Sequence, residues 1–213
     1  MRRIMDLKTK LFSFFLLPII FAVSSCQAQD TKKVGGTCEG CEAIYEYGSK
    51  ILSSVDTLPE FQQNQPKLKI SGTVFKKDGK TPAENVLIYI YHTNRTGTYQ
   101  TKENAKGWAK LHGFIRGWLK TGADGRYTFY TFLPAAYPDG SEPGHIHITV
   151  KEPQKNEYYL DEYLFEGDPL LAQSVKDRLK NRGGSGIVNA KPGDGLLNVK
   201  RDIVLGKNIP GYE

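Results

Sequence analysis

The sequence of 213 residues has few of the features on which several protein classes depend. It has only three cysteines, too few for a framework of several disulfides or for a four-cysteine zinc site. No basic stripe with interleaved aromatic residues is present, so nucleic acid is not an expected partner. No internal repeat and no long low-complexity tract is visible either. A globular domain with one core is the class that remains.

The sequence also lacks a hydrophobic run long enough to cross a bilayer as a helix. The uncharged run from Leu11 to Val23 has about 13 residues, whereas a spanning helix needs roughly 20. A basic head precedes the run and consists of Arg2, Arg3, Lys8 and Lys10. A basic head followed by an apolar run of this length is typical of a secretory signal, so we expect an exported protein.

The end of this run, Val23-Ser24-Ser25-Cys26, resembles a bacterial lipoprotein cleavage box. The resemblance implies a signal peptide over residues 1–26 and acyl chains on Cys26 that hold the protein at a membrane surface. Gln27 follows where an aspartate would favour the inner membrane, so we expect a lipoprotein on the periplasmic or outer-membrane face. An ordinary signal peptide, cleaved near Ala28, is the alternative.

Part of the positive charge belongs to this leader. The whole chain has a formal charge of +6, and residues 1–26 contain four basic groups and one acid, which leaves about +3 on the remainder. A net charge this small gives no argument for a nucleic-acid partner.

The two remaining cysteines, Cys38 and Cys41, have the spacing C-x-x-C. In an oxidising compartment this spacing favours a short-loop disulfide. A redox-active pair and half of a zinc site are alternatives, but no thioredoxin-like βαβ pattern surrounds the pair. Residues 27–65 are otherwise polar and irregular, and we expect them to form a tether and an arm packed on the domain.

From residue 66 to residue 213 the pattern is that of an all-β domain. Apolar residues alternate with polar or aromatic ones in several segments, which predicts an antiparallel β-sandwich with one or two short helices. Asp168-Pro169 resembles the start of a helix that ends before Gly183. The expected strands cover residues 68–74, 86–93, 126–133, 145–151 and 198–205.

One strand carries two histidines on the same face. His145 and His147 are alternate residues, and alternate residues of a strand lie about 6.6 Å apart on one face, close enough for both rings to lean onto one metal ion. The loop that leads into them begins at Tyr137, and tyrosinate is a hard anionic ligand suited to ferric iron. With twelve tyrosines in the chain, this pattern alone does not identify the tyrosine ligands.

Several blocks of the sequence, in order over about residues 68–206, resemble the intradiol ring-cleavage dioxygenases, which include protocatechuate and catechol dioxygenases. The blocks are Ser71–Val74, Tyr89–Asn94, Gly97-Thr98-Tyr99, Arg116-Gly117, Thr121–Leu133, Pro134–Pro138, His145-Ile146-His147, Phe165–Pro169 and Asp202–Leu205.

The resemblance implies a sandwich that binds one Fe(3+) through Tyr99, Tyr137, His145 and His147. It implies that a catechol binds as a dianion in place of Tyr137, which then acts as a base. Dioxygen would cleave the ring, and both of its atoms would enter a muconate-type diacid. The substrate partners are therefore a catechol-type aromatic and O2, with the region from Tyr99 to Trp118 expected to line the pocket.

Two positions depart from the family pattern. The family usually has an arginine three residues before the first histidine, where this chain has Glu142, and a glutamine where this chain has Glu162. Two carboxylates near a dianionic substrate raise the electrostatic cost of binding it. The candidates to compensate for that charge are Arg95, Arg116 and Arg126.

Three other functions stay open. The first is a non-catalytic binding module like transthyretin or the carboxypeptidase regulatory domains, which share the sandwich but have no reason to carry a Tyr-Pro loop before H-x-H. The second is a lipoprotein in which the loop of Cys38 and Cys41 is the active part, and the third is a zinc or copper site of the histidines alone. A homo-oligomer is also open, because edge strands of a sandwich often need to be covered.

Overall fold

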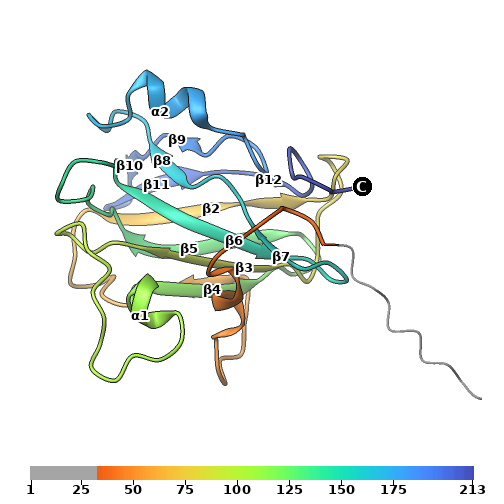
Figure 1. Ribbon diagram of the computed structural model, residues 1–213, viewed down its shortest axis with the longest axis horizontal. Coiled ribbons are helices and arrows are strands. Elements are labelled where there is room, and N and C mark those ends of the chain that lie inside the picture. The colour runs from red at the N-terminus through yellow and green to blue at the C-terminus, as the bar shows by residue number, and fades with distance from the viewer. Residues whose placement is uncertain (1–32) are drawn as a thin grey trace, which may run out of the picture. The chain divides into compact units, whose positions relative to one another are not determined.

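The computed structural model describes residues 33–213, which form two six-stranded sheets (Figure 1). The first sheet has the strand order β1 (Val55–Thr57), β5 (Arg126–Phe132), β2 (Lys67–Phe75), β11 (Leu196–Lys200) and β10 (Lys191–Gly193), and β12 (Ile203–Val204) also pairs with β2. The second has the order β4 (Arg116–Lys120), β3 (Leu87–His92), β6 (His145–Lys151), β8 (Tyr163–Phe165) and β9 (Ile187–Val188), and β7 (Glu157–Tyr159) pairs with β6.

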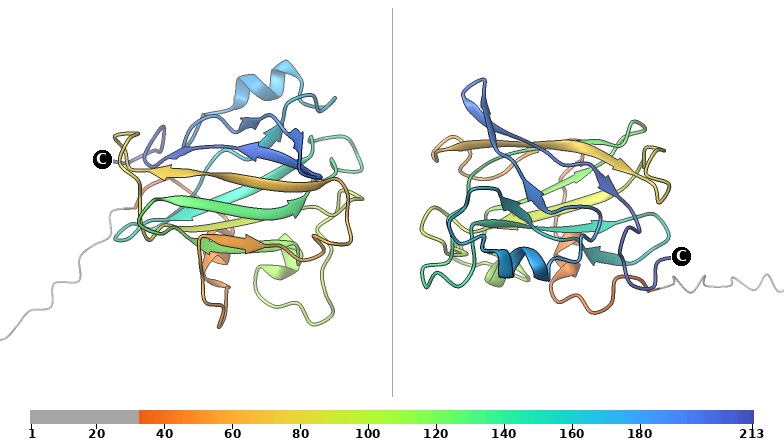
Figure 2. Two further views of the ribbon diagram at one scale, coloured as in Figure 1. Left: turned by 180° about the vertical axis from the view of Figure 1, so that it is seen from behind. Right: turned by 90° about the horizontal axis from the view of Figure 1, so that it is seen from above.

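Antiparallel pairs form the centre of each sheet. In the first sheet β2 pairs with β5 over seven positions, and in the second β3 pairs with both β4 and β6. The rear view in Figure 2 shows β1, β5, β2 and β11 side by side. Parallel pairs occur between β1 and β5, between β2 and its C-terminal partners β11 and β12, and between β8 and β9. The predicted β-sandwich with two short helices is confirmed.

The main core lies between the sheets and follows the alternation of the sequence. On β6 the side chains of Ile146, Ile148 and Val150 are buried in this core, so His145 and His147 face outward from the sandwich. The same rule buries the predicted face of β2, where Leu68 and Ile70 have no exposed surface. A shift of one residue in either strand would exchange the two faces, so burial fixes the register.

A second, smaller core lies on the outer face of the second sheet. The short 3-10 helix η1 (Cys41–Tyr45) of the arm brings Ala43 and Ile44 onto Tyr89 of β3 (Figure 1). The Trp118 indole N–H donates to the Ala43 carbonyl at 3.0 Å, which closes one side of this contact. Tyr89 lies on the outer face of β3, and the arm covers it completely.

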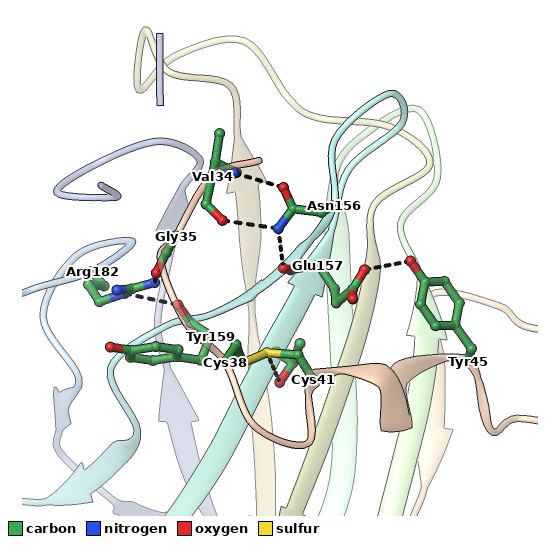
Figure 3. Close-up of a disulfide and its surroundings, with 10 residues drawn as sticks. Val34, Gly35, Cys38, Cys41, Tyr45, Asn156, Glu157, Tyr159 and Arg182 are labelled. Carbon is green, nitrogen blue, oxygen red and sulfur yellow. Dashed lines mark hydrogen bonds between the residues drawn. A yellow bond between two sulfur atoms is a disulfide. The ribbon is translucent and has the colours of Figure 1, made fainter. Parts of the chain in front are cut away.

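Polar contacts and a disulfide hold the arm in this position (Figure 3). The predicted disulfide between Cys38 and Cys41 is present, and the Cys41 sulfur lies 3.8 Å from the Thr149 hydroxyl. The Asn156 side chain accepts from the Val34 amide at 2.7 Å and donates to its carbonyl at 3.0 Å. Tyr45 donates to Glu157 at 2.7 Å, so both ends of the segment from residue 34 to residue 45 are tied to β7 or to the turn before it.

Some details differ from the sequence-based expectations. The helix expected from Asp168 begins later, because α2 spans Gln173–Arg178 with no side-chain cap. Asp168 instead accepts from the amides of Leu170 and Gly144, so its carboxylate closes a turn and ties it to the start of β6. The closing strand expected over residues 198–205 is two strands, β11 and β12, separated by Arg201 and Asp202. β1 comes from residues that the sequence assigned to the arm.

The other helix, α1 (Ala109–His112), has four residues. Among residues 33–213, no helix has the length and apolar character needed to span a bilayer.

We predict that the arm adds measurable stability through its small core. Replacing Ile44, which has no exposed surface, by alanine should lower the free energy of unfolding by about 2–4 kcal/mol, because it leaves a cavity against Tyr89. The matched control is Ile51→Ala in the same arm, where the side chain is 95% exposed and the change should be within about 0.5 kcal/mol. Urea denaturation of the two variants makes the comparison, and equal midpoints would contradict a docked arm.

Candidate metal centre

The two histidines of β6 are held by the backbone that surrounds them. The Nδ1 atom of His145 lies 2.7 Å from the Pro143 carbonyl oxygen, and this contact fixes the orientation of the ring at the first residue of β6. Gly144 lies between Pro143 and His145 in the chain, and a Cβ at this position would be 2.9 Å from the Pro134 carbonyl oxygen. The ring of His147 stacks on Tyr91, its cross-strand partner on β3, with 4.4 Å between ring centroids.

Tyr99 reaches the histidines from the loop that follows β3. Asn94 organises this loop, because its side-chain oxygen accepts from the amides of Thr96 and Thr98 at 2.9 and 3.0 Å. Gly97 has a φ of 75° and passes so close to the next loop that a Cβ there would lie 2.0 Å from the Ala136 carbonyl oxygen. Only glycine fits at this crossing, and the crossing brings Tyr99 against the loop that carries Tyr137.

Tyr137 lies in the loop between β5 and β6. Its amide donates to the Glu142 carbonyl at 3.2 Å and its carbonyl accepts from the Gly140 amide at 2.9 Å, so the segment folds into a closed turn. The turn points the phenol back toward the histidines, where its ring meets that of His145 edge-on at 5.3 Å between centroids.

The four predicted ligand side chains therefore meet at one point. The Tyr99 hydroxyl lies 2.8 Å from Nε2 of His147, 3.4 Å from Nε2 of His145 and 3.0 Å from the Tyr137 hydroxyl. The two Nε2 atoms are themselves 3.0 Å apart. Among residues 33–213, no group of three or more His, Cys, Asp or Glu side chains is placed to hold a metal, and this cluster instead combines two histidines with two tyrosines.

The protonation of the histidines shows why a cation fits this cluster. The Pro143 carbonyl can only accept, so Nδ1 of His145 carries the proton and Nε2 carries a lone pair. Nδ1 of His147 faces the Glu162 carboxylate at 3.5 Å, which favours the same tautomer. Two lone pairs then face each other at 3.0 Å, a separation that two imidazoles have when they bind one metal ion at about 2.1 Å.

Burial opposes charge on the cluster itself. Burial, followed by the hydrogen bond to Tyr137, raises the pKa of Tyr99 well above its ordinary value. Burial and the neighbouring His147 lower the pKa of His145, so its ring is neutral and free to act as a ligand. A bound cation would stabilise the ionised phenol of Tyr99 and so lower the pKa that burial raises.

The two glutamates that depart from the family pattern both border this cluster. Glu162 is 38% exposed and faces His147. Burial acts to raise the pKa of its carboxyl, but the hydrogen bond with His147 is the largest of the opposing effects, and the pKa lies below the ordinary value. Glu142 is half-buried, and its side chain lines the same cavity as Tyr137.

This cavity has a volume of about 450 Å³ and opens beside the histidines and Tyr137. Three basic residues line it from the C-terminal side, namely Arg178, Lys180 and Arg182. The three arginines that the sequence suggested as compensating charges do not line this cavity. Arg116 is paired with Glu46 at 2.6 Å, Arg126 is 79% exposed beside Asp124, and Arg95 donates to the Leu133 carbonyl.

Sequence reasoning missed the aromatic residues behind the cluster. Tyr91 stacks between His147 and His112, with 3.8 Å between the centroids of Tyr91 and His112. Within residues 99–118, which were expected to line the pocket, Tyr99 contributes to the cluster and His112 lines a cavity beside it. The signal for Tyr91 was its place opposite His147, which only the register of β3 and β6 reveals.

The comparisons with known proteins agree with this geometry. The chain matches the family described as "Dioxygenase" over residues 54–205, which is more than half of its length. It is 29% identical to the protocatechuate 3,4-dioxygenase beta chain of Burkholderia cepacia over 157 residues, which cover 64% of this chain and 66% of that one. It is also 29% identical to catechol 1,2-dioxygenase 1 of Acinetobacter lwoffii, covering 64% of this chain and 49% of the relative.

The chain belongs to the intradiol dioxygenase family. It spans about half to two thirds of the length of these two curated relatives. Among solved structures, it is similar to the dioxygenase domain of a dioxygenase carbohydrate-binding protein fusion from Streptomyces sp. SirexAA-E, with 27% identity and a TM-score of 0.51. That match covers 65% of this chain and 79% of the other.

The fold also matches that of wild-type catechol 1,2-dioxygenase from Acinetobacter radioresistens. The TM-score is 0.55 over 78% of this chain and 62% of the other, and the sequence identity is 18%. The match supports the intradiol dioxygenase-like sandwich as the fold. Residues 33–53 of the arm precede the part of the chain that matches the family.

We predict that Glu162 strengthens metal binding through His147. The change Glu162→Gln removes the negative charge that faces Nδ1 of His147, so the affinity for the metal should fall about 10–100-fold. Glu166→Gln is the matched control, because Glu166 lies on the surface and pairs only with Lys176. Competition of the loaded protein with a chelator measures both, and an unchanged affinity in Glu162→Gln would contradict this role.

Proposed function

We propose that this protein is an iron-dependent dioxygenase that cleaves a catechol-type aromatic between its two hydroxylated carbons and yields a muconate-type diacid. The observation that supports this most is the convergence of Tyr99, Tyr137, His145 and His147 beside a cavity of about 450 Å³. Membership of the intradiol dioxygenase family supports the same reaction class.

The donor set favours ferric iron over zinc or copper. Phenolate oxygen is a hard anionic donor, and two phenolates with two neutral imidazoles would balance two of the three positive charges of Fe(3+). A ferric ion bound there would draw electron density from the tyrosinates and from a catecholate, and would open the substrate ring to attack by dioxygen. His145 and His147 would hold the ion on the rigid strand β6, whereas the tyrosines would hold it from loops.

Two side chains of the cavity are placed to take the protons of the substrate. A catechol must lose both phenolic protons to bind as a dianion. Tyr137 lines the cavity and lies at the edge of the cluster, so its phenolate would leave the centre and receive the first proton. Glu142 lines the same cavity, and its carboxylate would accept the second proton. Glu162 would act on His147 by holding the proton on Nδ1.

The basic residues of the cavity would offset the negative charge of Glu142 and Glu162. Arg178 and Lys180 make no ion pair or side-chain hydrogen bond within residues 33–213, so their charges are available to an anionic ligand. Arg182 is buried and, within residues 33–213, donates to the carbonyls of Tyr159 and Gly35. These three cations would offset the repulsion between a catechol dianion and the carboxylates.

The alternative of a non-catalytic binding module rests on the sandwich alone. It offers no reason for two histidine lone pairs and two phenols to meet at one point. The alternative with an active cysteine loop is disfavoured as well, because Cys41 is buried where the arm packs against Thr149 of β6 and its sulfur is held in the disulfide with Cys38. The zinc or copper alternative is decided by metal analysis.

The test of the proposal begins with colour and iron. The chain without residues 1–26, loaded with iron, should contain about one iron and show a broad visible band from the tyrosinate ligands. Tyr99→Phe should lose most of the band, whereas Tyr130→Phe, on the outer side of the other sheet beside Phe61, should keep it. Oxygen electrode measurements with a panel of catechols should then show uptake of one O2 for each ring cleaved.

Two outcomes would contradict the proposal in different ways. A colourless protein that stays iron-free after reconstitution would remove the metal centre and leave the binding module. An iron-loaded, coloured protein that takes up no oxygen with any catechol would keep the centre but remove the dioxygenase activity.

We also propose that the protein is an exported lipoprotein anchored through Cys26, a residue outside the described part of the chain. In bacterial cells, radiolabelled palmitate should enter the full-length protein, and the protein should fractionate with membranes. Cys26→Ser should abolish the label, whereas Cys38→Ser should leave it. A cleaved, unlabelled protein would point to the ordinary signal peptide.

A further inference from the structure

A second cavity lies beneath the arm, next to the candidate centre. It has a volume of about 270 Å³, and its walls come from the disulfide loop on one side and from β3 and β6 on the other. His147, Tyr159 and Glu162 line both this cavity and the larger one beside Tyr137, so the two adjoin. A ligand held at the centre therefore has room to extend under the arm.

The wall that the arm provides is fixed in place. Thr37, Cys38, Glu39 and Gly40 form it, and the disulfide closes the loop at one end of this stretch (Figure 3). Arg182 donates to the Gly35 carbonyl at 3.0 Å, and Figure 3 shows its side chain between Gly35 and Tyr159. This wall lies outside the part of the chain that matches the family, so the cavity is a feature of this chain and not of that match.

A ring nitrogen of His112, a residue that lines this cavity, has no hydrogen-bond partner among residues 33–213. His112 is only 7% exposed, and its Nδ1 is bonded to the Tyr89 hydroxyl at 2.9 Å. No side chain or backbone group within residues 33–213 bonds its Nε2, which lies against Gly40 in the cavity wall. Whichever tautomer the ring adopts, Nε2 keeps one unused donor or acceptor.

The charge of the cavity narrows the choice of ligand. Its lining includes the carboxylates of Glu39 and Glu162 but no lysine or arginine. Glu39 is exposed and has no partner among the described residues. An anionic group in this space would face two carboxylates, whereas a neutral group that both donates and accepts could donate to Glu39 and still meet Nε2 of His112 in either tautomer. A hydroxyl group has this chemistry.

We propose that the cavity beneath the arm is a subsite for a neutral, hydroxyl-bearing substituent of a catechol, read by Nε2 of His112 and the carboxylate of Glu39. This inference rests on the proposed function, because it assigns a substrate class to the same centre. The subsite excludes catechols with an anionic substituent and leaves Nε2 of His112 unsatisfied when an alkyl substituent enters.

Three catechols that differ only in the group at the 4-position test the proposal. They carry hydroxymethyl, methyl or carboxylate, and their binding to the iron-loaded chain without residues 1–26 is measured by anaerobic titration calorimetry. The hydroxymethyl compound should bind about 3–10-fold more tightly than the methyl compound, which is the gain of one or two hydrogen bonds. The carboxylate compound should bind most weakly of the three.

Two variants assign the preference to the residues named. Glu39→Gln, on the exposed arm, should strengthen binding of the carboxylate compound several-fold relative to the methyl compound, while Glu103→Gln at a remote exposed site should change neither. His112→Phe keeps an aromatic ring against Tyr91 and should remove the preference for hydroxymethyl, and a thermal unfolding curve checks its fold.

The outcomes separate this proposal from the proposed function. Equal affinities of the wild-type protein for the hydroxymethyl and methyl compounds, or tightest binding of the carboxylate compound, would overturn the subsite while catechol binding itself stands. A loaded protein that binds none of the three would overturn both. A preference that persists unchanged in both Glu39→Gln and a folded His112→Phe would overturn the assignment to these residues.

Discussion

The antiparallel pairing of β3 with β6 is the constraint on which the rest of the site depends. It places Ile88 and Ile90 beside the isoleucines of β6 in the core, and this burial fixes which residues face outward. The outward residues of the two strands then form one row, in which Tyr91 lies opposite His147 and stacks on its ring. The candidate centre on this face is therefore positioned by the same apolar contacts that hold the sandwich together.

The candidate centre brings together groups that a bound cation would satisfy. Backbone and carboxylate partners hold the outer nitrogens of His145 and His147, which leaves two lone pairs 3.0 Å apart. Burial at the same time keeps the nearby phenol of Tyr99 neutral until a cation is present. Burial thus resists negative charge at this point, and the histidine lone pairs and the phenols together provide the donors that a trivalent ion requires.

Charge around the cavity is distributed in a way that the family pattern does not predict. Glu142 and Glu162 add negative charge beside the centre, while Arg178, Lys180 and Arg182 bring positive charge from the segment around α2. On the other side, the arm brings Glu39 and a disulfide loop over His112. The two sides of the centre therefore differ in charge, because basic residues line the first cavity but not the one beneath the arm.

The sequence by itself determined the sandwich, the faces of its long strands and the outward pair of histidines, because period-two alternation encodes burial directly. Its motif order also gave the family. The resemblance also named Tyr99 and Tyr137 out of twelve tyrosines, but only the tertiary structure shows how they approach those histidines, because the close crossing at Gly97 joins two loops that are far apart in the chain. The tertiary structure also decided which arginines line the cavity and that the arm covers His112, since neither loop convergence nor the docking of an irregular segment leaves a periodic signal.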